Sequence, residues 1–191
     1  KEAACSLEQA ACSQHVRPAV ACADSACYNI AMKDEAGVAP GRQGFVTPDR
    51  LVDGDLALAL ESEQPGDPAR GYVPTYAFQM ARLPSGEEVG HISLRIESSP
   101  HILFYAGHIG YGVHREHRGR HYAARACRLL LPLARAHGIR SLWITCNPDN
   151  TASRRTCELA GARFVEIVDL PEDSDMYQRG ERQKCRYRLD L

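Results

Sequence analysis

The stretch "GYGVHREHRGRHYAARACRLLLPLARAHG", residues 110–138, decides the fold of this chain. It begins like the end of a strand, is dense in Arg and His in its middle, and continues with the apolar spacing of an amphipathic helix. The pattern predicts this helix at 119–137, with a kink at Pro132, which lacks a backbone donor. The sequence therefore predicts a strand that turns directly into the start of a helix.

A turn from a strand into a helix is a ready site for an anion. The first amides of a helix have no partner within it, and the helix dipole adds about half a positive charge there. Residues 114–128 hold five Arg and three His against one carboxylate. Arg118 and Arg120 put full charges beside the amides of 119–124. The ligand of this turn is therefore expected to carry phosphate groups.

Short apolar runs on both sides of this stretch indicate strands. They are DLALALES (55–62), the hairpin of TYAFQMARL (75–83) and EEVGHISLRIE (87–97), ILFYAGHIGYGV (102–113), RSLWITC (140–146), ARFVEIVD (162–169) and QKCRYRLDL (183–191). A second helix is expected in NTASRRTCELAG, 150–161, ended by its glycine. The Pro- and Gly-rich segment 63–74 cannot form a regular element. This order predicts a mixed α/β sheet with helices packed on it.

Composition excludes several classes of protein. Of the 191 residues 44% are hydrophobic and 25% are charged, which is ordinary for a globular domain. The net charge of −1 gives the chain no electrostatic reason to bind nucleic acid or an acidic membrane. Within the basic cluster only Tyr122 could stack on a base, and no apolar run reaches the roughly 18 residues of a membrane span.

The first forty residues differ from the rest. Residues 1–40 are rich in Ala and Cys and are expected to form an N-terminal extension, either helical or loose, before a domain at 41–191. The start of the chain lacks the charge and hydropathy grading of a secretory signal, and the cysteines are expected to be reduced. The expected location is therefore cytoplasmic. The cysteines of the extension lack the close spacing of a zinc site, and no metal is expected.

Two segments together resemble the Gcn5-related N-acetyltransferase (GNAT) superfamily. They are "HIGYGVHREHRGRHYAARACRLL" (108–130) and "NPDNTASRRTCELAGARF" (147–164). The family's pyrophosphate loop, [QR]-x-x-G-x-[GA], is matched at Arg118 and Ala123, with His121 in the glycine slot. The motif N-x-x-S is matched at Asn150 and Ser153, and Gly161 and Phe164 follow as the family's glycine and aromatic.

The resemblance covers residues 55–191 and implies a GNAT-type sheet, mixed, mostly antiparallel and twisted, with flanking helices. It also implies acetyl-CoA as cosubstrate. Backbone donors along Tyr111 to Val113 would hold the thioester oxygen and the pantetheine amides, and glycines 110 and 112 suit such a close approach, although a simple bulge would also explain them. Asn150 would bind the pantetheine arm, cap the second helix, or do both. The loop residues that would surround the phosphates are Arg118, Gly119, Arg120, His121, Tyr122 and Ala123.

The chain departs from the family at two positions. His121 places a side chain where the family has glycine; we expect it to have ordinary helical dihedral angles and to point away from the cofactor. Cys157 stands where many members have the tyrosine that protonates the leaving thiolate. Ser153 is the alternative donor that a sibling branch uses, and Cys157 itself is a further one.

Acetyl transfer to an amine needs a base, oxyanion donors and a proton for the thiolate. The strand HIGYGV is similar to EIGYW in the branch that acetylates ribosomal-protein N-termini, which places His108 at that branch's catalytic Glu. The ordinary pKa of a histidine, about 6.5, suits a general base at neutral pH. The alternative is a partly buried His on a strand, whose hydrogen bonds are satisfied.

The resemblance implies an N-acetyltransferase that moves acetyl directly from CoA to a primary amine in a ternary complex. The expected partners are acetyl-CoA and a small-molecule, peptide or protein amine, with no nucleic acid or membrane; a homodimer is left open. The acceptor site is expected to be formed by segment 63–76, the C-terminal strands and the acidic loop with Glu172, Asp173 and Asp175. The alternative is an acetyl-CoA-binding sensor with weak or no turnover.

Overall fold

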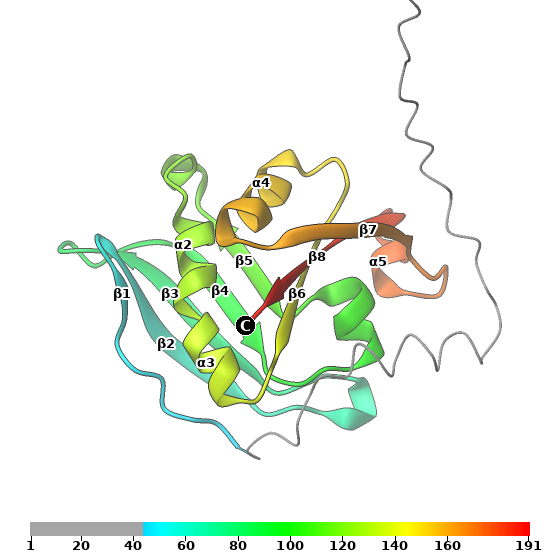
Figure 1. Cartoon of the computed structure of the whole chain (residues 1–191), viewed down its shortest axis with the longest axis horizontal. Coiled ribbons are helices and arrows are strands. Elements are labelled where there is room, and N and C mark those ends of the chain that lie inside the picture. The colour runs from blue at the N-terminus through cyan, green and yellow to red at the C-terminus, as the bar shows by residue number, and fades with distance from the viewer. Residues whose placement is uncertain (1–43) are drawn as a thin grey trace, which may run out of the picture. The chain divides into compact units, whose positions relative to one another are not determined.

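The computed structural model describes residues 44–191, and the predicted extension at 1–40 lies outside them. Two antiparallel sheets make up the domain (Figure 1). The first has the order β1 (Leu51–Asp53), β2 (Leu56–Gln64), β3 (Thr75–Arg82), β4 (Glu87–Arg95) and β5 (Ile109–Val113). The second has the order β6 (Ser141–Cys146), β8 (Gln183–Asp190) and β7 (Arg163–Asp169). The mixed, mostly antiparallel α/β fold is therefore confirmed.

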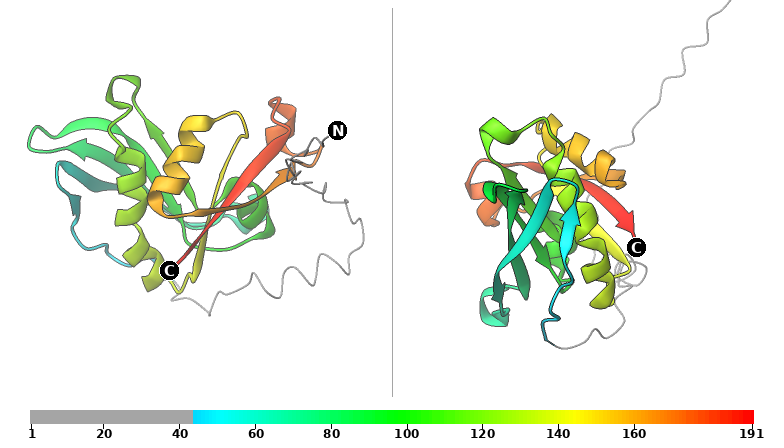
Figure 2. Two further views of the ribbon diagram at one scale, coloured as in Figure 1. Left: turned by 45° about the horizontal axis from the view of Figure 1, so that its top comes forward. Right: turned by 90° about the vertical axis from the view of Figure 1, so that its left-hand side faces the viewer.

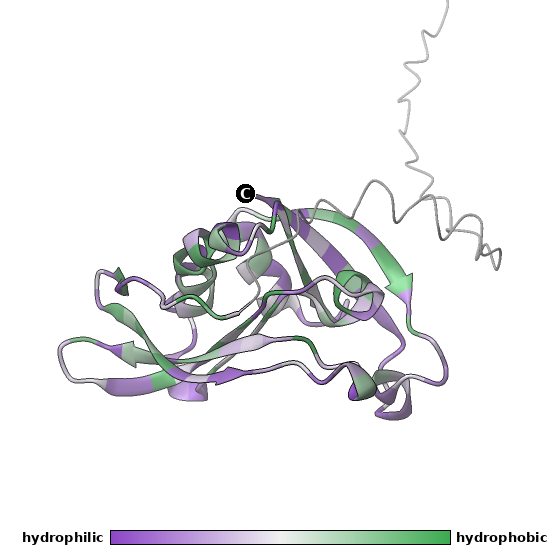
Figure 3. Cartoon of the chain, turned by 90° about the horizontal axis from the view of Figure 1, so that it is seen from below, coloured by the Kyte–Doolittle hydropathy of each residue, from purple (hydrophilic) through white to green (hydrophobic). Residues whose placement is uncertain are grey.

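Helices pack on one face of these strands, as Figures 1 and 2 show. They are α2 (Tyr122–Leu129), α3 (Leu131–Ala136) and α4 (Thr151–Ala160). A short α5 (Asp175–Gln178) follows β7 and has no buried residue. Polar and apolar residues alternate along the strands and around the helices (Figure 3). The apolar sides of α2 and α4 meet those of both sheets in one core. This core fixes where the first turn of each helix lies.

The helix expected at 119–137 is two helices. The first begins at Tyr122, and Leu130 separates α2 from α3. Pro132 lies in the first turn of α3, where a missing amide costs no hydrogen bond. The expected break at this proline is therefore confirmed, while the start of the helix lies three residues later than predicted.

The strand expected at 102–113 is wrong in its first half. Residues Ile102–Ala106 form one turn of π-helix, and β5 begins only at Ile109. Arg95 of β4 donates from Nη1 to the carbonyl of Gly107, at 3.1 Å, and so holds the end of this turn. Gly107 has a φ of 69° and leaves no room for a side chain against the backbone of β6. The apolar run is thus a buried turn, because Ile102 and Leu103 face the core.

The two sheets are joined where β5 begins. The amide of His108 donates to the carbonyl of Trp143 in β6, at 2.6 Å. The amide of Trp143 donates in turn to Nδ1 of the His108 ring, at 3.0 Å. Further along, β5 and β6 belong to different sheets. One side of β5 is therefore free of a neighbouring strand beyond this junction.

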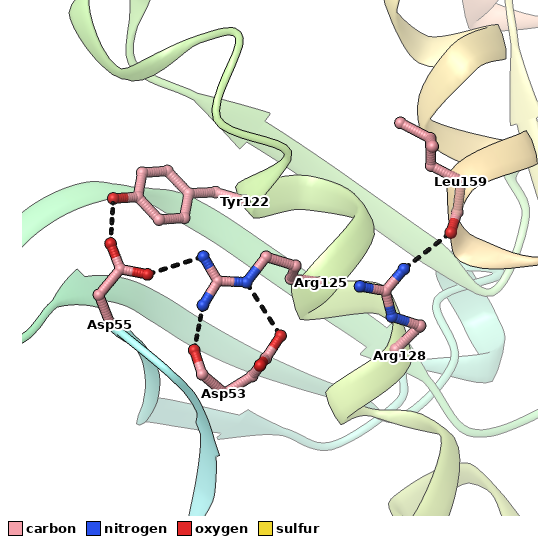
Figure 4. Close-up of polar contacts among 6 residues, drawn as sticks. All are labelled: Asp53, Asp55, Tyr122, Arg125, Arg128 and Leu159. Atoms are coloured by element: carbon pink, nitrogen blue, oxygen red, sulfur yellow. Dashed lines mark hydrogen bonds and ion pairs between the residues drawn. The ribbon is translucent and has the colours of Figure 1, made fainter.

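A polar cluster fixes helix α2 to the turn between β1 and β2 (Figure 4). Arg125 of α2 donates from Nε to the carboxylate of Asp53, at 2.9 Å, and from Nη1 to that of Asp55, at 2.7 Å. Its Nη2 also bonds the carbonyl of Asp53. Tyr122 donates its hydroxyl proton to Asp55, at 2.9 Å. The hydrogen bond from Arg125 and, second, the bond from Tyr122 lower the pKa of Asp55. The cluster also orients the first turn of α2.

We expect Arg125→Ala to lower the free energy of unfolding by about 2 kcal/mol, because the partly buried guanidinium satisfies two carboxylates and a carbonyl. Arg128→Ala is the matched control on the same helix: Arg128 makes one exposed hydrogen bond, to the carbonyl of Leu159 (Figure 4), and its loss should cost about 0.5 kcal/mol or less. Urea unfolding of both variants measures the difference; equal losses would contradict a special role for the cluster.

Candidate acetyl-CoA site

The backbone of β5 presents unpaired groups on the side away from β4. The backbone amide of Arg95 donates to the carbonyl of His108, and the backbone amide of His114 donates to the carbonyl of Val89. The even-numbered residues of β5 therefore hydrogen-bond β4 through their backbone. Peptide groups alternate in direction along a strand. The amides of Tyr111 and Val113 therefore point the other way, toward the side on which β5 has no strand neighbour. These are the two residues whose backbone the sequence predicts to hold the thioester and pantetheine.

The two glycines of β5 serve the packing of β4 on its other face. A Cβ at Gly112 would lie 2.6 Å from the ring of His91, and one at Gly110 would lie 3.2 Å from Oγ of Ser93. The register of β4 and β5 runs without a shift from Ile109 to Val113, so the alternative of a bulge is wrong. The close approach of His91 therefore requires glycine at 112, while the contact of Ser93 at Gly110 is less tight.

The basic loop after β5 is tied to the tip of the β3–β4 hairpin. Nε2 of buried His117 lies 3.3 Å from the carboxylate of Glu87, and Nε2 of His114 lies 3.6 Å from that of Glu88. Arg118 donates from Nε to the carbonyl of Val113, at 3.2 Å. The loop is therefore held in place by side chains, while Arg118 itself remains exposed.

His121 is in the left-handed conformation, with φ 58° and ψ 20°. The expectation of ordinary helical dihedral angles is therefore wrong. Among residues 44–191 His121 has the one positive φ outside glycine. Its carbonyl accepts the Arg125 amide, at 3.1 Å, so the sharp turn at His121 starts the helix. The family's glycine at this slot has a physical reason, since a left-handed residue with a side chain costs about 1–2 kcal/mol.

The loop carries exposed cations and free amides next to each other. Arg118, Gly119, Arg120 and His121 are exposed, and Gly119 has a φ of 82° with open space around it. The amides of Tyr122 and Ala123 open α2 and have no partner within the helix. The side chain of Tyr122 is buried and turned to Asp55, so this residue offers a ligand only its backbone.

The start of α4 lies against the side chain of Tyr111. Asn150 caps the helix: its Oδ1 accepts the amide of Ser153, at 3.0 Å, as the capping alternative predicts. The hydroxyl of Tyr111 donates to the carbonyl of Ser153, at 3.3 Å. Burial, first of all, raises the pKa of Tyr111, so its hydroxyl keeps its proton. The sequence motifs indicated the backbone of Tyr111 as a donor to the cofactor. No motif near Tyr111 indicated a role for its hydroxyl.

Cys157 is fully buried on the inner face of α4. A hydrogen bond with the thiol of Cys146, and then burial, raise the pKa of Cys157, so it remains a protonated thiol. On the same helix Arg154 donates to the hydroxyl of Tyr187, at 3.3 Å, and Arg155 pairs with Glu158, at 3.0 Å. The two arginines therefore have partners within the domain.

His108 is completely buried, and both of its ring nitrogens have partners. Nδ1 accepts the Trp143 amide, so the ring proton lies on Nε2, which is 3.0 Å from Oγ of Ser98. Burial, and then the charge of Arg95, lower the pKa of His108 to about 4. The ring is therefore neutral at pH 7 and connects the two sheets.

We expect His121→Gly to raise the free energy of unfolding by about 1 kcal/mol, because glycine adopts the left-handed conformation without strain. The β-branched control His121→Val should lower it, since valine at positive φ is strongly disfavoured. Thermal unfolding of the two variants measures both effects. A loss of stability with glycine would mean that the exposed imidazole contributes more than the backbone strain costs.

The burial of His108 gives stability a specific dependence on pH. Its folded-state pKa of about 4 lies below the ordinary 6.5, so the unfolded chain binds the proton more tightly. The contribution is complete above pH 6.5 and is lost as the pH falls toward 4, by up to about 3 kcal/mol. His108→Gln should flatten this slope, and His91→Gln, at an exposed position, should not. Urea unfolding at pH 7, 6 and 5 measures the slopes; parallel curves for wild type and His108→Gln would contradict the assignment.

Two kinds of feature are absent from the described residues, a metal-binding cluster and a membrane-spanning helix. Residues 44–191 contain no group of three or more His, Cys, Asp or Glu side chains that could hold a metal ion. None of their helices is long and apolar enough to cross a membrane.

Several solved structures are similar to this chain. A candidate ribosomal-protein-serine acetyltransferase from Vibrio cholerae shares 15% identity over 76% of this chain and 100% of its own, with a TM-score of 0.53. A GNAT-family acetyltransferase from Bacillus anthracis shares 20% identity over 60% of this chain and 65% of its own, at 0.47. A ribosomal-protein-S5-alanine acetyltransferase from Vibrio fischeri shares 18% identity over 61% of each chain, at 0.48. This chain spans less than two thirds of the length of the last two.

A search of curated proteins gives no match. A family model described as an acetyltransferase (GNAT) domain matches residues 57–163, which is more than half of the 191 residues. The matched range includes β5, the basic loop and the start of α4. The chain therefore belongs to the GNAT acetyltransferase family.

Proposed function

We propose that this protein is an N-acetyltransferase that transfers acetyl directly from acetyl-CoA to a primary amine in a ternary complex. One observation carries the proposal: β5 turns the amides of Tyr111 and Val113 to its open side and then leads into the basic loop and α2. Pantetheine carries amide groups along its length, and its other end carries phosphates. The free strand edge and the free helix amides thus match the two ends of one cofactor.

The phosphates would bind at the start of α2. The amides of Tyr122 and Ala123 and the helix dipole attract anions there, and Arg118 and Arg120 add charge. The cluster around Arg125 holds this first turn in place, so the amides are oriented before the ligand arrives. Asn150 already caps α4, and its side-chain amide nitrogen is what it can still offer to the pantetheine arm.

Transfer itself requires donors for the oxyanion and for the leaving thiolate. The amide of Tyr111 or Val113 would hold the thioester oxygen on the open side of β5. The hydroxyl of Ser153, in the first turn of α4, would donate to the thiolate, as the N-x-x-S motif predicts. The protonated hydroxyl of Tyr111 lies beside the same turn and could stand in for it.

We propose that His108 is a positioning residue, because its ring is buried and bonded at both nitrogens. A general base needs a nitrogen within reach of the acceptor and a pKa near the working pH. Both nitrogens of His108 are engaged, and its pKa of about 4 is too low for a base at pH 7. We propose that the ring fixes β5 against β6 and so places the amide of Tyr111. The prediction that His108 removes the proton of the amine is therefore not favoured.

The acceptor would enter near the π-helical turn. Segment 63–76 lies at the same end of the domain as this turn and α5 (Figures 1 and 2). Glu172, Asp173 and Asp175 are exposed there. An acidic rim favours a cationic acceptor, such as a peptide N-terminus, a lysine or a small amine. The sensor with weak turnover is the second candidate, because His108 and Cys157 are both buried.

Acetyl-CoA should raise the melting temperature, and thiol release should depend on the amine supplied in a panel of peptides, polyamines and small amines.

The double variant Arg118→Ala with Arg120→Ala should bind acetyl-CoA about tenfold more weakly or worse, because two charges near the phosphates are lost. Arg155→Ala, an exposed arginine paired on α4, is the control. Binding with no release for any amine would favour the sensor; no shift at millimolar acetyl-CoA would end the proposal.

A further inference from the structure

A fully buried arginine lies against the π-helical turn. Arg186 belongs to β8, the central strand of the second sheet, and is 1% exposed. Its guanidinium lies between two aromatic rings, with Cζ 4.0 Å from the centre of the Trp143 ring and 4.2 Å from that of Phe104. Its Nη1 bonds the carboxylate of Glu166 on β7. These partners offset the cost of burying a charge inside the domain.

Arg186 also bonds the backbone of the turn. Its Nε donates to the carbonyl of Leu103, at 3.1 Å, across 83 positions of the chain. On β6, Thr145 donates from Oγ1 to the carbonyl of Tyr105, at 2.7 Å. Arg95 of β4 holds the end of the turn from the first sheet. Side chains from both sheets therefore fix this turn through its carbonyl groups.

Three aromatic rings follow one another along the turn. The ring centres of His101 and Tyr105 are 6.1 Å apart, and those of Phe104 and Tyr105 are also 6.1 Å apart. Phe104 and Tyr105 are partly buried, and His101 is exposed. In the proposed function the acceptor enters near this turn, so these rings would form one wall of its site. Arg186 stacks on the Phe104 ring and bonds the same turn, which places it to set the position of this wall.

We propose that Arg186 is a positioning residue for the acceptor, which fixes the π-helical turn so that the amine meets the thioester on β5. This inference rests on the proposed function, because the acceptor must bind beside the turn. The guanidinium is buried, so it acts through the turn and not by contact with the amine. The cofactor is proposed to bind β5, the basic loop and the start of α2. A displaced turn should therefore weaken binding of the amine and leave acetyl-CoA bound.

Steady-state kinetics of Arg186→Met, with the amine that the wild type acetylates best, tests this role. Methionine fills part of the same space without a charge, and the side chain of Glu166, which is 41% exposed, can then be solvated. The KM for the amine should rise by about tenfold or more, while kcat and the Kd of acetyl-CoA should change by less than about twofold. A smaller fraction of folded protein would lower kcat and would leave KM unchanged.

Arg188→Met is the matched control on the same strand. The Cζ of Arg188 lies 5.9 Å from the centre of the same Trp143 ring, but its Nε donates to Asp190, at 2.7 Å. This variant removes an arginine beside the same ring without removing a bond to the turn. The KM for the amine, kcat and the Kd of acetyl-CoA should all stay within about twofold of the wild type.

Thr145→Val is an independent variant that decides the matter where Arg186→Met does not fold. It removes the bond to the carbonyl of Tyr105 with little change of shape, so the KM for the amine should rise by about threefold or more. An unchanged KM in the deciding variant, an equal rise in Arg188→Met, or a matching loss of acetyl-CoA affinity would overturn the inference and leave the proposed function intact. A wild type that binds acetyl-CoA but acetylates no amine would mean that the proposed transfer has failed, and this role with it.

Discussion

The domain depends on the contact between His108 and Trp143. At this point, two sheets that share no other strand pairing are bonded through the amide and the ring of one residue. Because the bond lies at the start of β5, the rest of that strand is free on one side. A continuous sheet would have used the amides of Tyr111 and Val113 in its own ladder. The buried, neutral histidine thus joins the two sheets at the start of β5 and leaves the edge of β5 beyond it without a strand neighbour.

The second constraint fixes the helix that follows. The carboxylates of Asp53 and Asp55 hold Arg125, and the left-handed turn at His121 aims the first amides of α2 outward. The Arg125 bonds and the left-handed residue His121 both determine the position of the first turn of α2. The strained residue persists because the core side chains of α2 and the Arg125 bonds determine where the helix must begin. The basic loop and the first turn of α2 are therefore held by contacts within the domain itself.

The sequence predicts most of the fold because its signals are local. Alternation of apolar residues gives six of the strands, the helix pattern gives α4, and Pro132 gives the break between α2 and α3. The π-helical turn was missed because a short apolar run can be a strand or a buried turn. The left-handed His121 was missed for a similar reason, since its position before a helix suits helical angles equally well.

The site is predicted less completely, because its key contacts join distant residues. Arg125 meets Asp53 across 72 positions of the chain, and Trp143 meets the His108 ring across 35. Spacing within a motif carries no information about such pairs. The motifs indicated Asn150 and Ser153 at the start of α4, and the structure places both there. The burial of His108 and the contacts of Arg186 follow only from how the two sheets meet.

We propose that the open side of β5 binds the cofactor through its backbone. Amide hydrogen exchange, followed by NMR with and without acetyl-CoA, tests it most directly. The exchange of the Tyr111 and Val113 amides should slow when acetyl-CoA binds. The Gly110 and Gly112 amides, which face β4, should change little. Saturating acetyl-CoA that leaves the Tyr111 and Val113 amides exchanging as before would contradict the account.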